Sequence, residues 1–176
     1  MKRWIVILLA MQAGILSTEA LGKEVRKMEK LTVTSKAFAE GAAIAVKHTC
    51  DGDDVSPPLA IGATPAGTRS LALIMDDPDA PGGSWVHWVA WNIPPQTREI
   101  PENGMPAAAR LGRNDWKRNG YGGPCPPSGT HRYFFRLYAL DTTLELAPSA
   151  TKADLERAME GHVLAAGQLM GTYKRR

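Results

Sequence analysis

The sequence predicts a single, mainly β domain: a β-sandwich or barrel-like sheet with peripheral helices. Short apolar segments rich in β-branched and aromatic residues recur along the chain. The 17 glycines and 13 prolines suit many short elements that are joined by turns. A length of 176 residues, with 44% hydrophobic and 22% charged side chains, is typical of one compact globular domain.

Four segments carry the strand prediction. Residues 31–35 alternate apolar and polar side chains, as a half-buried strand does. Residues 70–75 form a continuous apolar run, which favours a buried strand. Residues 85–93 are aromatic and β-branched and lie between a Gly-Gly and a Pro-Pro pair, and residues 132–140 form another strong strand.

One helix is expected near the C-terminus. Thr151 is a good N-cap with Asp154 three positions on, which resembles a capping box. Apolar residues then follow at three- and four-residue spacing, and this stripe predicts a helix packed on the sheet: Leu155, Met159, Val163, Ala166 and Met170. The basic residues 174–176 would lie where the helix dipole favours cations.

The N-terminus has the pattern of a secretory signal. A basic start at residues 1–3 precedes an apolar stretch, residues 4–16, and small residues at Ala20 and Gly22 suit cleavage after either. The apolar stretch is shorter than the roughly 20 residues of a membrane-spanning helix. We therefore predict a signal peptide at residues 1–22, a polar leader at 23–30, one domain at 31–176, and a periplasmic or secreted location. An uncleaved N-terminal anchor is the alternative.

Charge and cysteine content narrow the functional classes. The net charge of +3 is small, and no internal Lys/Arg cluster is interleaved with aromatic residues, so nucleic-acid binding is not expected. The two cysteines, Cys50 and Cys125, fit one disulfide in an exported chain, or two buried thiols. Sequence alone does not decide between these, because a disulfide requires the two Cα atoms to lie within about 7 Å.

Titratable side chains gather at the predicted strand ends. His131 and Tyr133 share one face of a strand, and His87 shares a face with Val89 and Trp91 by the same alternation. A buried imidazole needs a hydrogen-bond partner, which Asp77 or a bound anion would supply. The glycine-rich residues 120–124 would let backbone N–H groups approach a ligand. These features indicate a site for a phosphomonoester, an amino-phosphate head group or a carboxylate.

Two motifs resemble the signatures of the phosphatidylethanolamine-binding protein family. Residues 77–81 (Asp-Pro-Asp-Ala-Pro), followed by His87-Trp88 and residues 92–94 (Asn-Ile-Pro), are similar to the first signature. Residues 123–133 (Gly-Pro-Cys-Pro-Pro-Ser-Gly-Thr-His-Arg-Tyr) are similar to the second. Residues 50–52 and 56–59 resemble the bacterial and archaeal, Raf kinase inhibitor-like branch. The resemblance covers roughly residues 31–173.

The resemblance implies an antiparallel β-sandwich with a small anion pocket at one end, no cofactor and no metal. The residues that match the family's pocket are Asp77, His87, Gly123, Pro124, His131 and Tyr133. Asp79 and Pro81 match structural motif positions, and Asp79 is expected to brace a turn. The expected function is non-catalytic anion binding, with a further role in regulating or inhibiting another protein. Phosphate is expected to protect the protein from unfolding more at pH 6 than at pH 8.

Two alternatives remain. His87, His131 and Asp77 match the inventory of a metal-dependent enzyme or a hydrolase, and Cys125 near His131 is a conceivable thiol–imidazole pair. The second alternative is a protease-inhibitor scaffold that presents residues 98–116 to another protein. The same residues are equally an ordinary connection with a short helical turn.

Overall fold

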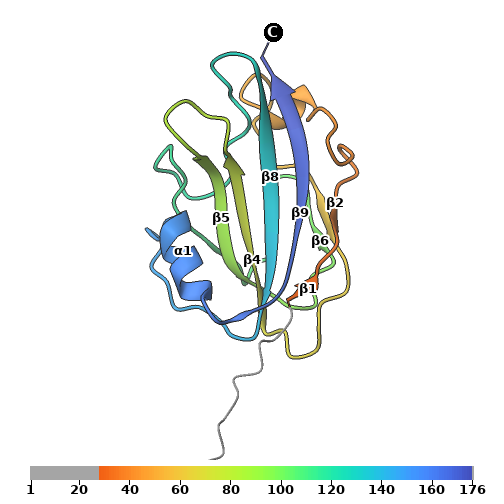
Figure 1. The fold of residues 1–176 in the computed structure, drawn as a ribbon, viewed down its shortest axis with the longest axis vertical. Coiled ribbons are helices and arrows are strands. Elements are labelled where there is room, and N and C mark those ends of the chain that lie inside the picture. The colour runs from red at the N-terminus through yellow and green to blue at the C-terminus, as the bar shows by residue number, and fades with distance from the viewer. Residues whose placement is uncertain (1–27, 176) are drawn as a thin grey trace, which may run out of the picture.

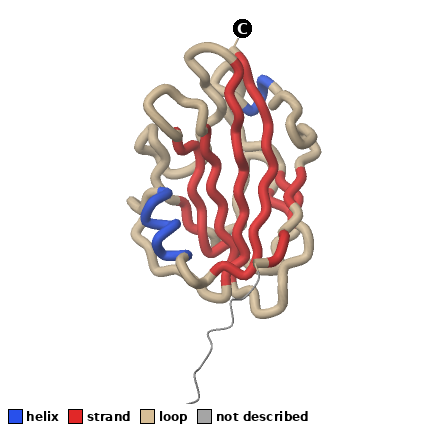
Figure 2. The backbone as a smooth tube through the Cα atoms, in the orientation of Figure 1, coloured by secondary structure: helices blue, strands red, loops and turns tan. Residues whose placement is uncertain are grey.

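The computed structural model describes residues 28–175, and the predicted signal peptide lies outside this range. A six-stranded sheet has the order β1-β9-β8-β4-β5-β7, and a three-stranded sheet has the order β2-β3-β6. Figure 1 shows the large sheet face-on with α1 beside β5, and Figure 2 shows that loops gather beyond the strand ends. No helix in the described range is long and apolar enough to cross a membrane.

The large sheet consists of β1 (Glu29–Lys30), β4 (Ser70–Asp77), β5 (Trp85–Ile93), β7 (Arg110–Leu111), β8 (Thr130–Leu140) and β9 (Val163–Lys174). The small sheet consists of β2 (Val33–Thr34), β3 (Leu59–Ile61) and β6 (Glu99–Ile100). The helical elements are the 3-10 helix η1 (Val46–His48) and α1 (Lys152–Met159). All strand pairs are antiparallel except β1 with β9. The expected mainly β fold is therefore confirmed.

Two apolar clusters hold these layers together. The larger cluster includes Leu73, Trp88 and Phe135 of the large sheet and Leu59 and Ile100 of the small one. The second cluster joins the opposite face of the large sheet to α1, chiefly through Ile74, Val89, Trp91 and Leu155. Each central strand therefore buries both of its faces, which explains the continuous apolar run in β4.

Most predicted strands have nearly the expected bounds. β5 begins and ends where the sequence predicts, and β4 and β8 each extend the prediction by two residues. The predicted strand at 31–35 is reduced to β2, while β1 lies within the segment expected to be a polar leader. Residues 98–116 contain β6 and β7 and single hydrogen-bonded turns, such as the bond from the N–H of Ala109 to the carbonyl of Pro106 at 2.9 Å.

The C-terminal helix prediction is wrong beyond Met159. The capping box of Thr151 and Asp154 forms as predicted, but α1 ends at Met159. Gly161 then takes a left-handed conformation with φ of 79°, which favours glycine and turns the chain out of the helix. The following residues form β9, which pairs with β8 along nearly its whole length. Lys174 therefore ends a strand rather than a helix.

Candidate functional site

A cavity of about 290 Å³ lies at the end of the large sheet where β4 ends and β5 and β8 begin. Its polar side chains are Asp77, His87 and His131. Its remaining walls are apolar or disulfide-bonded, and they are formed by Ala80, Pro81, Trp85, Trp116, Cys125, Pro126 and Pro127. A larger, open hollow of about 650 Å³ along β1, β8 and β9 has no histidine in its lining, so the smaller cavity is the candidate site.

Asp77 and His131 meet across the β4–β8 pair. Nδ1 of His131 lies 2.7 Å from Oδ2 of Asp77, and both residues are buried. The other carboxylate oxygen of Asp77 accepts a hydrogen bond from the backbone N–H of Asp79 at 2.9 Å. Because the Asp77 carboxylate can only accept, Nδ1 of His131 donates, and Nε2 is the ring nitrogen that remains for a ligand.

A β-bulge turns His87 toward the cavity. Met75 pairs with Trp88 and Asp76 pairs with Val86, so His87 is an extra residue on β5. The predicted alternation with Val89 and Trp91 is therefore wrong, since those two residues belong to the cluster beneath α1.

The imidazole of His87 packs between two aromatic rings. Its ring centroid lies 5.2 Å from that of Tyr133 and 4.8 Å from that of Trp116, both edge-on.

The protonation of His87 follows from its surroundings. Nδ1 lies 2.7 Å from the carbonyl oxygen of Gly122, and a carbonyl oxygen can only accept a hydrogen bond. Nδ1 therefore carries a proton. Burial is the main influence on the pKa of His87 and lowers it. The hydrogen bond to Gly122 and the charge of Asp77 act in the opposite direction, but the effect of burial is larger. His87 is thus neutral near pH 7, and its Nε2 is an acceptor.

Tyr133 lies behind His87 rather than in the cavity lining. Its side chain is fully buried, and its hydroxyl lies near the carboxylate of Asp77 and the backbone of Cys125. Burial, followed by the charge of Asp77, raises the pKa of Tyr133, so the hydroxyl keeps its proton. The structure thus brings Asp77, His87 and His131 together at the cavity and places Tyr133 against His87.

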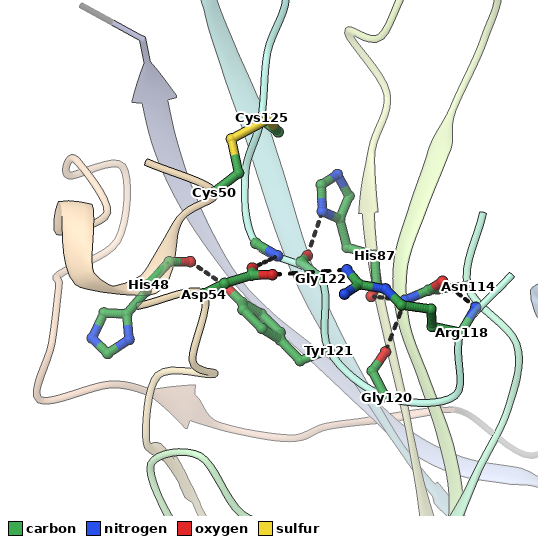
Figure 3. Close-up of polar contacts among 11 residues, drawn as sticks. His48, Cys50, Asp54, His87, Asn114, Arg118, Gly120, Tyr121, Gly122 and Cys125 are labelled. Atoms are coloured by element: carbon green, nitrogen blue, oxygen red, sulfur yellow. Dashed lines mark hydrogen bonds and ion pairs between the residues drawn. A yellow bond between two sulfur atoms is a disulfide. The ribbon is translucent and has the colours of Figure 1, made fainter. Parts of the chain in front are cut away.

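Gly123 and Pro124 do not line the cavity. The N–H of Gly122 donates to the carbonyl of His87 at 3.0 Å, and the N–H of Gly123 donates to Oδ1 of Asp54 at 2.6 Å. Both amides are therefore occupied within the protein, and neither of these two N–H groups points to a ligand in this structure. Figure 3 shows this arrangement beside the Cys50–Cys125 disulfide.

Asp79 lies at the turn that follows β4. It accepts hydrogen bonds from the backbone N–H, Nε and Nη2 of Arg132 at 2.9, 2.9 and 2.6 Å. The Arg132 side-chain hydrogen bonds are the main cause that lowers the pKa of Asp79 to about 2. Asp79 thus ties the turn after β4 to β8, while Pro81 of the same turn lines the cavity.

Two features bear on the metal and thiol chemistry that the first alternative includes. Residues 28–175 contain no group of three or more His, Cys, Asp or Glu side chains that could hold a metal ion. Cys125 is bonded to Cys50, with Cα atoms 5.4 Å apart, so it offers no free thiol to His131. The sequence did not identify Asp54 or Trp116 as parts of this region, because neither stands in a recognised motif.

Two packed sheets with a small cavity at one end define a β-sandwich fold. The family model for phosphatidylethanolamine-binding protein matches residues 34–174, and the chain belongs to this family.

Similar sequences and solved structures support the same family assignment. The UPF0098 protein of Methanothermobacter thermautotrophicus is 52% identical over 151 residues, which cover 82% of this chain and 99% of the relative. A UPF0098 protein of Pyrococcus horikoshii is 48% identical over 186 residues, covering 100% of this chain and 91% of the relative.

A phosphatidylethanolamine-binding protein homologue from Chlamydia trachomatis has a TM-score of 0.80 at 39% identity. Escherichia coli YbcL, described as a member of the mammalian family, has a TM-score of 0.79 at 31% identity. Each comparison covers 84% of this chain and 99% of the other.

Proposed function

We propose that the chain is a non-catalytic binding protein for a small anion, and that the Asp77–His87–His131 cavity holds the ligand. The ligand class is inorganic phosphate, a phosphomonoester such as phosphoethanolamine, or a carboxylate. The observation that carries the proposal is the pair of buried imidazoles, each held through Nδ1 by a protein acceptor so that Nε2 remains available.

The two imidazoles suit a singly protonated phosphate. A neutral His87 accepts a hydrogen bond from a P–OH group, and His131 donates to a charged oxygen when it is protonated at both nitrogens. A phosphomonoester carries such a P–OH group mainly below its second pKa, about 6. Binding is therefore stronger at pH 6 than at pH 8, as expected from the sequence.

The composition of the cavity walls suits the binding of an anion. Among the described residues that line the cavity there is no serine or threonine, and the cysteine is disulfide-bonded, so no hydroxyl or free thiol is placed to attack a bound ligand. Tryptophan and proline side chains surround the polar groups, and this apolar surrounding strengthens hydrogen bonds to an anion.

We also propose that the protein is exported to the periplasm or secreted. The Cys50–Cys125 disulfide supports this location because disulfides persist mainly in oxidising compartments.

Heat unfolding with and without ligand tests the proposed function. Millimolar phosphate or phosphoethanolamine should raise the Tm, because a ligand that binds only the folded state stabilises it. The rise should be larger at pH 6 than at pH 8, and His131→Gln should abolish it. His162→Gln, which alters an exposed histidine that does not line the cavity, should keep it. Absence of any ligand-induced shift at either pH would contradict the proposal.

A further inference from the structure

The loop of residues 46–55 is attached to the segment 120–125 behind the cavity (Figure 3). The Cys50–Cys125 disulfide is one attachment, and the N–H of Cys50 donates to the carbonyl of Pro124 at 3.1 Å. The hydroxyl of Tyr121 donates to the carbonyl of His48 at 2.6 Å. These contacts join two segments that are far apart in sequence, and the disulfide reaches the cavity wall through Cys125.

Asp54 makes the contact that reaches the site. Its Oδ1 accepts a hydrogen bond from the N–H of Gly123 at 2.6 Å. The N–H of Gly123 and the carbonyl of Gly122 belong to one peptide group, and that carbonyl accepts the hydrogen bond from Nδ1 of His87 at 2.7 Å. A trans peptide group is planar, so fixing its N–H also fixes the direction of its carbonyl. Hydrogen bonds in a chain also polarise and strengthen one another.

The local backbone is shaped for this contact. Asp54 has a φ of 55°, a left-handed conformation that costs free energy for a residue other than glycine. A Cβ atom on Gly123 would lie 2.7 Å from Oδ1 of Asp54 and 2.7 Å from the carbonyl oxygen of His48. Glycine at position 123 is therefore required by the approach of the 46–55 loop, which accounts for Gly123 without a ligand contact.

We propose that Asp54, which does not line the cavity, is a positioning residue for the bound anion. Through the Gly122–Gly123 peptide it holds His87 in the Nδ1–H tautomer and leaves Nε2 as the acceptor for the ligand. The effect on affinity rests on the proposed function, whereas the coupling of Asp54 to His87 is a property of the protein without ligand.

Three variants separate the hydrogen bond from charge and backbone strain. Asp54→Gly removes the acceptor and tolerates the left-handed φ. Asp54→Asn keeps an acceptor oxygen without the charge. Asp53→Gly makes the same change at the exposed neighbouring residue and is the matched control.

The readouts are the ¹⁵N and ¹H NMR signals of His87 and the Kd for inorganic phosphate from calorimetry at pH 6. In Asp54→Gly the His87 ring signals should show a mixture of tautomers, and phosphate affinity should fall about tenfold. Asp53→Gly should match the wild type in both readouts. In Asp54→Asn the Gly123 amide proton and the His87 Nδ1 proton should both move toward weaker hydrogen bonding, because a neutral amide is a weaker acceptor than a carboxylate.

The two readouts distinguish a failure of the proposed function from a failure of the positioning role. If the wild type does not bind phosphate, the proposed function fails, and the NMR signals still test the coupling. If His87 keeps an unchanged Nδ1–H tautomer in Asp54→Gly, the positioning role is overturned. If that variant does not fold, Asp54→Asn decides: a shift of the Gly123 amide signal without a shift of the His87 signal overturns the role.

Discussion

Nδ1 of His131 lies 2.7 Å from Oδ2 of Asp77, although 54 positions separate the two residues in the sequence. The antiparallel pairing of β4 with β8 brings the end of one strand to the start of the other. Asp77 also accepts the N–H of Asp79 through Oδ1, so each carboxylate oxygen has a buried or partly buried donor. The Asp77 carboxylate therefore holds both the turn after β4 and the imidazole of His131, which faces the cavity.

Asp77→Asn is expected to destabilise the protein. An amide can replace only one of the two acceptor oxygens, because its NH₂ group cannot accept a hydrogen bond. One donor is then left unsatisfied at a cost of about 1–3 kcal/mol. For a domain of this size the Tm should fall by about 2–12 °C. Asp53→Asn, at an exposed position, should leave the Tm unchanged, and a Tm for Asp77→Asn equal to the wild type would contradict the prediction.

His87 is expected to make stability pH-dependent on the acid side of neutrality. Burial lowers the pKa of His87 in the folded state below the unfolded value of about 6.5. As pH falls below 6.5 the unfolded chain binds a proton that folded His87 does not, so the free energy of unfolding decreases until pH reaches the folded pKa. The slope contributed by this one group is at most about 1.4 kcal/mol per pH unit.

An NMR titration of the His87 ring measures the folded pKa directly, and a midpoint at or above 6.5 would refute this account. His87→Gln should lose less stability than the wild type between pH 7.5 and 5.5. The comparison requires phosphate-free buffer, because a bound anion would stabilise the folded state of the wild type.

The Cys50–Cys125 disulfide is expected to contribute substantially to stability because it joins positions 75 residues apart. A cross-link over a loop of this length typically stabilises a protein by about 2–4 kcal/mol, mainly by restricting the unfolded chain. The Cys50→Ser/Cys125→Ser variant should therefore unfold at a markedly lower temperature. Dithiothreitol should lower the Tm of the wild type and leave that of the variant unchanged. Equal responses of the two proteins to the reductant would be inconsistent with this role.

The strands and cavity residues that carry strong local signals could be predicted from the sequence. β5 has the predicted bounds because its aromatic and β-branched residues lie between glycine and proline pairs. The sequence predicts a helix where β9 forms because apolar residues recur there at three- and four-residue spacing. A strand that is buried on parts of both faces can show the same spacing. Gly161 was the available signal that the helix ends there.

Other features depend on contacts that no local pattern reveals. The bulge that turns His87 toward Tyr133 arises from the register of β5 against β4, whereas the prediction assumed strict alternation. The bond from Gly123 to Asp54 spans 69 positions, so the glycine pair at 122–123 could indicate a close approach but not its partner.

The Asp79–Arg132 contact is expected to stabilise the protein above about pH 4 and to lose this effect in acid. The pKa of Asp79 falls from 3.8 to about 2 on folding, mainly through its hydrogen bonds with the Arg132 side chain. The stabilisation is therefore fully present above 3.8 and disappears as pH falls through about 2. Because the side chain of Arg132 is exposed and that of Asp79 is partly exposed, Asp79→Asn should cost only about 1 kcal/mol at pH 7. Heat unfolding at pH 7, 4, 3 and 2 should show the Tm gap between wild type and variant narrowing below pH 4. A gap that stayed constant down to pH 2 would mean that Asp79 stabilises the turn through hydrogen bonds that an uncharged side chain makes equally well.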